Sequence, residues 1–207
     1  MTNYVMKCDQ PFAKSKVLIG IPCMSTIHTK TAFSLFNLKR PEGVEIELVM
    51  EINGEVARCR NLLAERAIKG GFTHLFFIDS DMKFNPDILE KMLAHDTDIV
   101  GVMYHQRRLP LCNNLMPLDV KEVKGQNKTV DFQVTDDVFE VNWVGTGIML
   151  VKTDVFKKLE APLFTFKHDP AEYMGEDVYF CRKAREAGYK IYVDADVAVR
   201  HVGEFEY

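Results

Sequence analysis

The segment from Leu75 to Asp81 most constrains how this chain can fold, because four apolar residues run directly into two aspartates. An uninterrupted apolar run is typical of a strand buried on both faces of a parallel sheet. Open α/β sheets bind ligands just beyond the carboxyl ends of their strands. We therefore expect Asp79 and Asp81 at the ligand edge, where paired carboxylates suit Mg²⁺ or Mn²⁺ carrying a phosphate better than zinc or copper.

The Asp-x-Asp pattern alone carries little information, because it occurs three times in the chain. The copy at 96–98 precedes a strand-like run and is typical of a helix-to-strand turn. The copy at 194–196 lies in an alternating segment and is expected in solvent. Only the copy at 79–81 directly ends an uninterrupted apolar run, so its position rather than its sequence makes it the candidate site.

Composition excludes several classes of protein. A chain of 207 residues is most simply one domain that buries roughly 70% of its unfolded surface. A net charge of −4 without a Lys/Arg run argues against nucleic acid as the main partner. Five cysteines without a Cys-x-x-Cys pair argue against a disulfide framework or zinc knuckle and for a reducing compartment.

No segment of the sequence is expected to span a membrane. Residues 1–16 lack the apolar stretch of a signal peptide, and no later run approaches the ~20 apolar residues of a membrane helix. The expectation is a soluble, cytoplasmic protein. A membrane-bound substrate would have to be reached through a partner or a peripheral face of the molecule.

The order of elements predicts an α/β fold with a mainly parallel, twisted sheet covered by helices. Strands are expected at 17–22, 45–50, 75–78 and 99–103. Asn53 is expected to cap a helix that stops at Gly70-Gly71, and Asn85-Pro86 to open another that ends near His95.

The second half of the chain is less regular. The segment 104–137 is long for a plain connection and is either substrate-facing or flexible. A strand pair is expected over 138–152, interrupted by Gly145-Thr146-Gly147. Helices should follow from Thr153 and from Gly175-Glu176-Asp177, and a last strand over 190–201. This half should contribute a smaller antiparallel element.

Four features, taken in chain order, resemble the nucleotide-sugar-dependent glycosyltransferases of the GT-A fold, especially the family 2-like members. They are Asp79-Ser80-Asp81, Gly145-Thr146-Gly147, Glu176-Asp177 and His201. The resemblance covers roughly residues 17–203. It implies one GT-A domain over 1–207, with a nucleotide-binding half at about 17–104 and an acceptor-side half at about 105–207.

The resemblance also implies a role for each motif. Asp79, Asp81 and His201 would hold Mn²⁺ or Mg²⁺ on the donor diphosphate and assist departure of the leaving group. Asp177 would act as general base, a contribution of about 10²–10⁴-fold, and Glu176 would orient the acceptor or the helix. First-turn acidic residues and a histidine at a strand end are also common structural features.

The remaining donor-binding residues come from the same resemblance. Arg60 would lie near the nucleotide base, although a helix with several arginines is equally consistent with a solvated face. Gly145 and Gly147 would let the backbone approach the donor sugar. Apart from the resemblance, Arg107 and Arg108 follow the fourth strand and are candidates for neutralising the diphosphate, although they are equally consistent with a pair of surface arginines. The other implied contacts are Ile21, Pro22, Cys23, Ser80 and, as the nearest candidate for reading uracil, Glu51.

The sequence therefore predicts a metal-dependent glycosyltransferase that moves a sugar from a nucleoside-diphosphate sugar to a hydroxyl of a glycan, protein-linked glycan or lipid. A UDP-sugar is the first candidate for the donor. Inversion through Asp177 is expected. One alternative is a haloacid-dehalogenase-like phosphoryl-transfer enzyme, although its Asp-x-Asp follows the first strand rather than the third. The other alternative is a non-catalytic domain that binds a sugar nucleotide or glycan.

Overall fold

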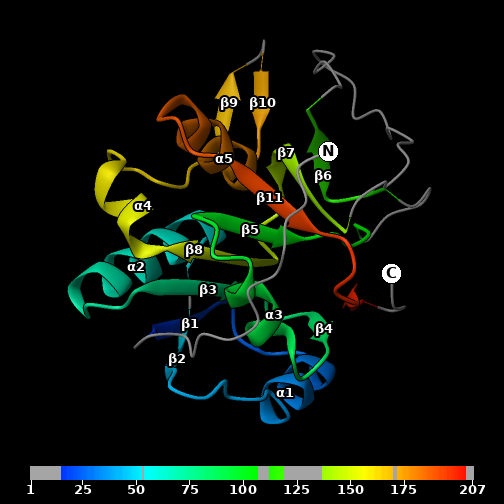
Figure 1. The fold of residues 1–207 in the computed structure, drawn as a ribbon. Coiled ribbons are helices and arrows are strands. Elements are labelled where there is room, and N and C mark those ends of the chain that lie inside the picture. The colour runs from blue at the N-terminus through cyan, green and yellow to red at the C-terminus, as the bar shows by residue number, and fades with distance from the viewer. Residues whose placement is uncertain (1–14, 53, 107–111, 119–136, 170–171, 204–207) are drawn as a thin grey trace.

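A sheet of eight strands forms the centre of the protein (Figure 1), as seen in a computed structural model that describes residues 15–52, 54–106, 112–118, 137–169 and 172–203. The strands of this sheet are β1 (Lys16–Cys23), β2 (Glu45–Ile52), β3 (His74–Ile78), β5 (Ile99–Val102), β6 (Leu115–Pro117), β7 (Val138–Val144), β8 (Ile148–Lys152) and β11 (Ile191–Asp194). Their spatial order is β2-β1-β3-β8-β5-β11-β7-β6.

Most of these strands run in one direction. β2, β1 and β3 are parallel neighbours, and β11 is parallel to β5. β8 is inserted antiparallel between β3 and β5, and β7 is antiparallel to β11 and β6. The predicted α/β class, with a mostly parallel sheet and an antiparallel part in the C-terminal half, is confirmed.

The prediction of a strand pair over 138–152 is wrong in one respect, because β7 and β8 are not neighbours in the sheet. β8 is buried along almost its whole length, whereas β7 is mostly half-buried. A strand of wholly apolar residues is most stable at the centre of a covered sheet. β8 therefore lies between β3 and β5, while β7 lies toward the edge.

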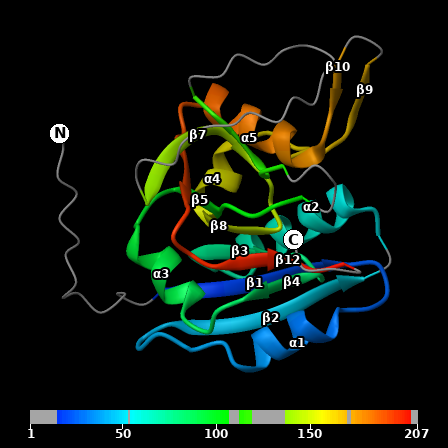
Figure 2. The same ribbon diagram turned by 90° about the vertical axis from the view of Figure 1, so that its right-hand side faces the viewer.

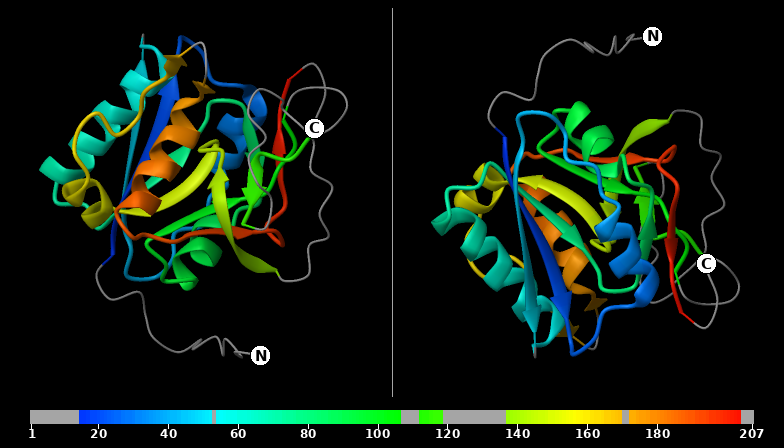
Figure 3. Two further views of the ribbon diagram at one scale, coloured as in Figure 1. Left: turned by 90° about the horizontal axis from the view of Figure 1, so that it is seen from above. Right: turned by 90° about the horizontal axis from the view of Figure 1, so that it is seen from below.

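Helices cover both faces of the sheet (Figures 2 and 3). One hydrophobic cluster includes side chains of α2 (Val56–Lys69), α4 (Thr153–Lys158) and α5 (Glu176–Glu186). The other includes side chains of α1 (Thr29–Phe36) and α3 (Ile88–Ala94). The predicted helix stops are confirmed at Gly71 and Gly188, whose φ angles are 65° and 90°. Asn53, the predicted cap of α2, lies outside the described residues, and Glu55 occupies the N-cap.

Two further strand pairs complete the fold. β9 (Lys167–Asp169) pairs with β10 (Glu172–Met174), and β4 (Met82–Phe84) pairs antiparallel with β12 (Val199–His201) (Figure 2). The second pair brings residues 199–201 beside the Asp-x-Asp segment. No helix among the described residues combines the length and the apolar character that are needed to cross a membrane.

The predicted last strand over 190–201 is divided into β11 and β12 by a turn at Asp194. The Asp194 carboxylate accepts hydrogen bonds from the backbone N–H groups of Asp196 and Val197 and lies 2.7 Å from His95 Nε2. Asp194 is only 4% exposed, so its expected position in solvent is wrong. Asp194 is buried because it caps this turn.

Candidate active site

A cavity of about 310 Å³ lies at the carboxyl ends of β3 and β5. Its volume is within the range of small-molecule sites. Residues far apart in the sequence line it, as expected for the ligand edge of an α/β sheet. Among the residues predicted from sequence, the cavity is lined by Arg60, Asp79, Gly145, Gly147, Glu176, Asp177 and His201.

Arg60 contacts three parts of the cavity wall. Its guanidinium donates to both carboxylate oxygens of Asp79 at 3.0 and 3.2 Å and to the carbonyl oxygen of Thr146 at 3.1 Å. Its Nε lies 3.3 Å from Glu176 Oε1. Arg60 is only 3% exposed, so the alternative of a solvated face does not hold for this arginine. A buried charge of this kind requires such partners.

Two carboxylates stand at the start of α5. Asp177 Oδ1 accepts a hydrogen bond from the backbone N–H of Val178 at 2.8 Å. Burial at the cavity wall raises the pKa of Asp177, and the negative charge of Asp79 acts in the same direction. Burial also raises the pKa of Glu176, although Arg60 opposes this effect. Of the two, Glu176 is the one paired with Arg60.

Tyr104 fills the space beside the two glycines. The backbone N–H of Gly147 donates to Tyr104 Oη at 3.0 Å. A Cβ on Gly147 would overlap Tyr104 Oη, and one on Gly145 would lie 2.9 Å from it. The glycines are therefore needed for the close approach of Tyr104. Burial and the charges of Asp79 and Asp177 raise the pKa of Tyr104, so its hydroxyl keeps its proton.

Asp81 and His201 form a pair at one end of the site. His201 Nε2 lies 3.3 Å from Asp81 Oδ1, and the backbone N–H of Val202 donates to Asp81 O at 2.7 Å. The His201 ring meets the Tyr104 ring edge-on, with centroids 5.6 Å apart. The pairing of β12 with β4 thus places His201 beside Asp81.

A divalent metal fits this pair only in part. Two ligands about 2.1 Å from one octahedral ion lie about 3 Å apart, close to the observed separation. A metal on Nε2 would still leave His201 Nδ1, which is buried, without a partner among the described residues. In addition, no three His, Cys, Asp or Glu side chains converge on one point within the described ranges. Asp79 is paired with Arg60 instead, so a metal here would complete its coordination with other ligands.

Some predicted donor-binding residues lie outside the cavity wall. Ile21 is fully buried and Cys23 is 5% exposed, so both pack mainly in the core at the end of β1. Glu51 pairs in register with Pro22 on β2. Ser80 accepts a backbone hydrogen bond from His28. Within the described part of the chain, the residues that line the cavity do not include Ile21, Pro22, Cys23, Glu51 or Ser80. Arg107 and Arg108 lie outside the described residues.

Three wall residues, Tyr104, Gln106 and Asn114, were not predicted from the sequence. From sequence alone Trp143, the only tryptophan, is consistent with stacking on a sugar face or with filling the core, and Thr146 belongs to the predicted glycine motif. Tyr104 comes two residues after β5, so the strand-end rule used for Asp79 also applied to it. Asn114 accepts the N–H of Tyr104 and donates to the Val102 carbonyl, holding the tyrosine in place. No sequence pattern indicated this contact. The additional lining residues are Tyr104, Gln106, Asn114, Trp143 and Thr146.

The sheet, with its Asp-x-Asp segment at a strand end, is that of the GT-A class of glycosyltransferase. The chain belongs to the glycosyltransferase-like family 2, whose family model matches residues 9–206. The predicted resemblance and enzyme class are thereby confirmed. A comparison with curated proteins gives no match.

Solved structures share the fold at low sequence identity. The structure of A197 from STIV is 19% identical with a TM-score of 0.62, and the match covers 91% of this chain and 86% of that chain. S. aureus TarS 1-349 is 15% identical with a TM-score of 0.53, and the match covers 89% of this chain and 59% of that chain. The complex of TarS with UDP-GlcNAc is 16% identical, with a TM-score of 0.53 and coverages of 89% and 57%.

Proposed function

We propose that this protein transfers a sugar from a nucleoside-diphosphate sugar, with a UDP-sugar as first candidate, to a hydroxyl of a glycan, protein-linked glycan or lipid. The observation that carries the proposal is one cavity that joins Asp177 to Asp79 and to His201, the partner of Asp81. Family membership supports the reaction type. The TarS complex with UDP-GlcNAc supports the choice of donor.

Asp177 is the proposed base. As the acceptor oxygen attacks the anomeric carbon, its proton passes to the Asp177 carboxylate, and the bond from that carbon to the diphosphate oxygen breaks. Attack opposite the leaving group inverts the anomeric centre. Glu176 is paired with Arg60, so it is better suited to positioning than to accepting a proton.

Asp81 and His201 are the proposed metal-binding residues. When bound, Mn²⁺ or Mg²⁺ supplies Lewis-acid stabilisation of the diphosphate leaving group. Mixed nitrogen and oxygen ligands favour Mn²⁺, since Mg²⁺ takes mostly oxygen. Asp79, held by Arg60, would orient the donor beside this pair.

Donor and metal binding can be tested by thermal unfolding. We expect Mn²⁺ together with a UDP-sugar or GDP-sugar to raise the melting temperature of the wild type, and Asp81→Ala to lose this shift. Asp196→Ala, which removes an exposed aspartate from another copy of the Asp-x-Asp pattern, should keep it. Equal donor-induced shifts with and without metal would contradict the metal site, and no shift with any donor would contradict the donor class.

The base can be tested separately by measuring transfer. Asp177→Asn should retain the donor-induced shift and lose about 10²–10⁴-fold in transfer rate. An unchanged rate in this variant would exclude Asp177 as base. Phosphatase activity that Asp79→Asn abolishes, without donor binding, would instead favour phosphoryl transfer.

A further inference from the structure

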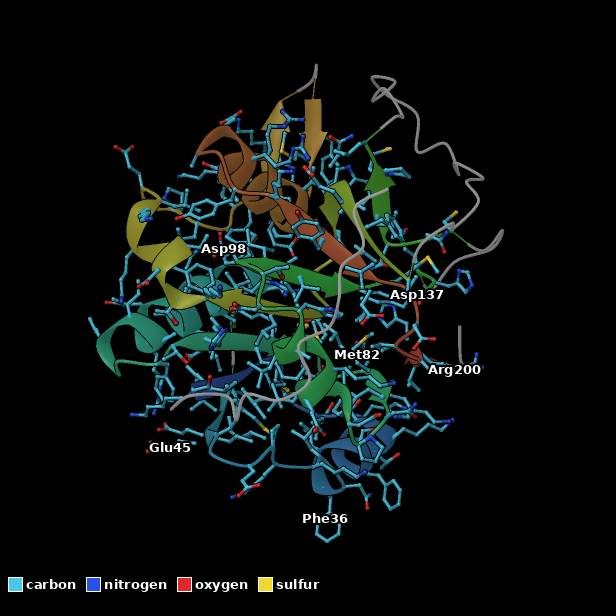
Figure 4. All side chains as sticks on the ribbon, in the orientation of Figure 1. Phe36, Glu45, Met82, Asp98, Asp137 and Arg200 are labelled. Carbon is cyan, nitrogen blue, oxygen red and sulfur yellow. The ribbon has the colours of Figure 1, made fainter. Side chains whose placement is uncertain are left out.

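Helix α1 buries polar residues and exposes aromatic ones, which is the reverse of the usual pattern of a surface helix. Its buried residues are Thr31 and Ser34, which are 0% and 7% exposed, whereas Phe33 and Phe36 are 71% and 88% exposed. In Figure 4 the ring of Phe36 projects from the lower edge of the molecule, away from the ribbon. Two such rings present on the order of 300 Å² of aromatic surface, which is the size of the largest apolar patch on a typical monomer, and such a patch often has a function.

Hydrogen bonds fix α1 in this orientation. Ser34 Oγ accepts the backbone N–H of Phe84 on β4 at 3.2 Å, and the His28 N–H donates to the Ser80 carbonyl at 2.8 Å. The helix cannot turn its phenylalanines inward without breaking these bonds. The exposed rings are therefore a property of the folded state.

The edge strand of the sheet also exposes apolar side chains. Leu48, Met50 and Ile52 are 44%, 38% and 47% exposed. They share a strand face with Ile46, because side chains alternate along a strand. Ile46 packs in the same cluster as Leu35 and Leu38 from α1 and the residues that follow it. The exposed residues of β2 and α1 therefore lie on the same side of the sheet.

The charge around α1 differs from that of the whole chain. Residues 24–44 contain Lys30, Lys39 and Arg40 and a single acidic residue, Glu42, whereas the chain has a net charge of −4. All three cationic residues are exposed. Exposed aromatic rings flanked by basic side chains are typical of surfaces that lie in the headgroup region of an anionic bilayer.

We propose that this α1 face, consisting of Phe33 and Phe36 with Lys30, Lys39 and Arg40, docks onto a lipid bilayer that contains anionic lipids. The phenylalanines would enter the headgroup region, and the cationic side chains would pair with lipid phosphates. The His28–Ser80 bond and the contacts of α1 with β4 connect this face to the Asp81–His201 end of the cavity. The proposal requires no transfer activity, since membrane binding is measured without donor or acceptor.

Vesicle flotation tests the proposal. We expect the wild type to float with phosphatidylcholine vesicles in which about one-third of the lipid is phosphatidylglycerol, and much less with phosphatidylcholine alone. Phe33→Ser/Phe36→Ser and Lys39→Glu/Arg40→Glu should each lower the bound fraction by at least about tenfold. Tyr173→Ser changes an aromatic residue on β10 that is 73% exposed, and should bind like the wild type.

The substituted side chains are exposed, so we expect the variants to fold with melting temperatures close to that of the wild type. Measuring these temperatures separates loss of vesicle binding from loss of folding. Equal flotation of the wild type and the double phenylalanine variant would overturn the proposal, as would no binding to anionic vesicles. Self-association that this variant abolishes, without vesicle binding, would assign the α1 face to a contact between copies of the chain and would also overturn it.

Discussion

At the scale of single residues, Tyr104 shapes the cavity wall. Its hydroxyl accepts the N–H of Gly147, and its ring lies edge-on against His201. The space that a side chain would need at Gly145 or Gly147 is taken by this phenol. The Gly145-Thr146-Gly147 motif was expected to make room for a ligand. In the structure, the space beside the two glycines is occupied by the ring of Tyr104.

This packing predicts different outcomes for alanine at the two glycines. Gly145→Ala should cost about 1–3 kcal/mol of unfolding free energy, and less in a Tyr104→Phe background, because its tightest contact is with Tyr104 Oη. Gly147→Ala should remain costly in both backgrounds, because its Cβ would also lie 2.9 Å from Tyr104 Cζ.

Urea unfolding of the single and double variants measures this coupling. Equal costs of Gly145→Ala in the presence and absence of the tyrosine hydroxyl would show that another contact requires the glycine.

At the scale of elements, Arg60 joins α2 to the end of β3 and to the first turn of α5. Asp79 and Glu176 are its two acidic partners. Removing one member of a buried ionic group leaves the others uncompensated, which costs more than the group contributes as a whole. The relative positions of these three elements, and so the width of the cavity, depend on this residue.

Arg60→Met should therefore lower the unfolding free energy by about 3–5 kcal/mol. Arg66→Met, on the same helix but with a side chain that is 53% exposed, should change it by no more than about 0.5 kcal/mol. Adding Glu176→Gln to Arg60→Met should recover part of the loss, since one of the unpaired charges is removed. Urea unfolding of the wild type and the three variants measures these differences. Similar losses for Arg60→Met and Arg66→Met would show that the buried pairing of Arg60 adds no more to the unfolding free energy than an exposed arginine does.

Elements also show where sequence patterns fail. α1 was not predicted, because its exposed phenylalanines and buried Thr31 and Ser34 reverse the usual pattern of a surface helix. The division of the last strand was not predicted, because the cap that Asp194 forms on this turn also involves His95, 99 residues earlier in the chain.

At the scale of the whole molecule, stability should depend on His74 at the start of β3. Burial and the charge of Lys152 lower the pKa of His74 to about 4, from about 6.5 in the unfolded chain. Between these values the unfolded state binds more protons than the folded state. The contribution of His74 to stability is therefore present above pH 6.5 and is lost as the pH falls toward 4.

We expect His74 to account for a loss of about 2 kcal/mol in unfolding free energy between pH 7 and pH 5. Urea unfolding at both pH values should show a smaller difference for His74→Gln than for the wild type. His105→Gln, which replaces an exposed histidine, should leave the difference unchanged. Equal pH dependence in all three proteins would rule out this role.

The sequence by itself determined the apolar strands, the glycine stops and the α/β class, because each depends on residues close together in the chain. It also determined the family, because the family is identified by the order of short motifs along the chain and not by which side chains touch. Tertiary structure alone decided that Arg60 pairs with Asp79 and Glu176, that Tyr104 occupies the space of two side chains, and that β8 separates β3 from β5. Local periodicity reports whether a side chain is buried. It does not report which distant side chain is its partner, and those partners form the walls of the cavity.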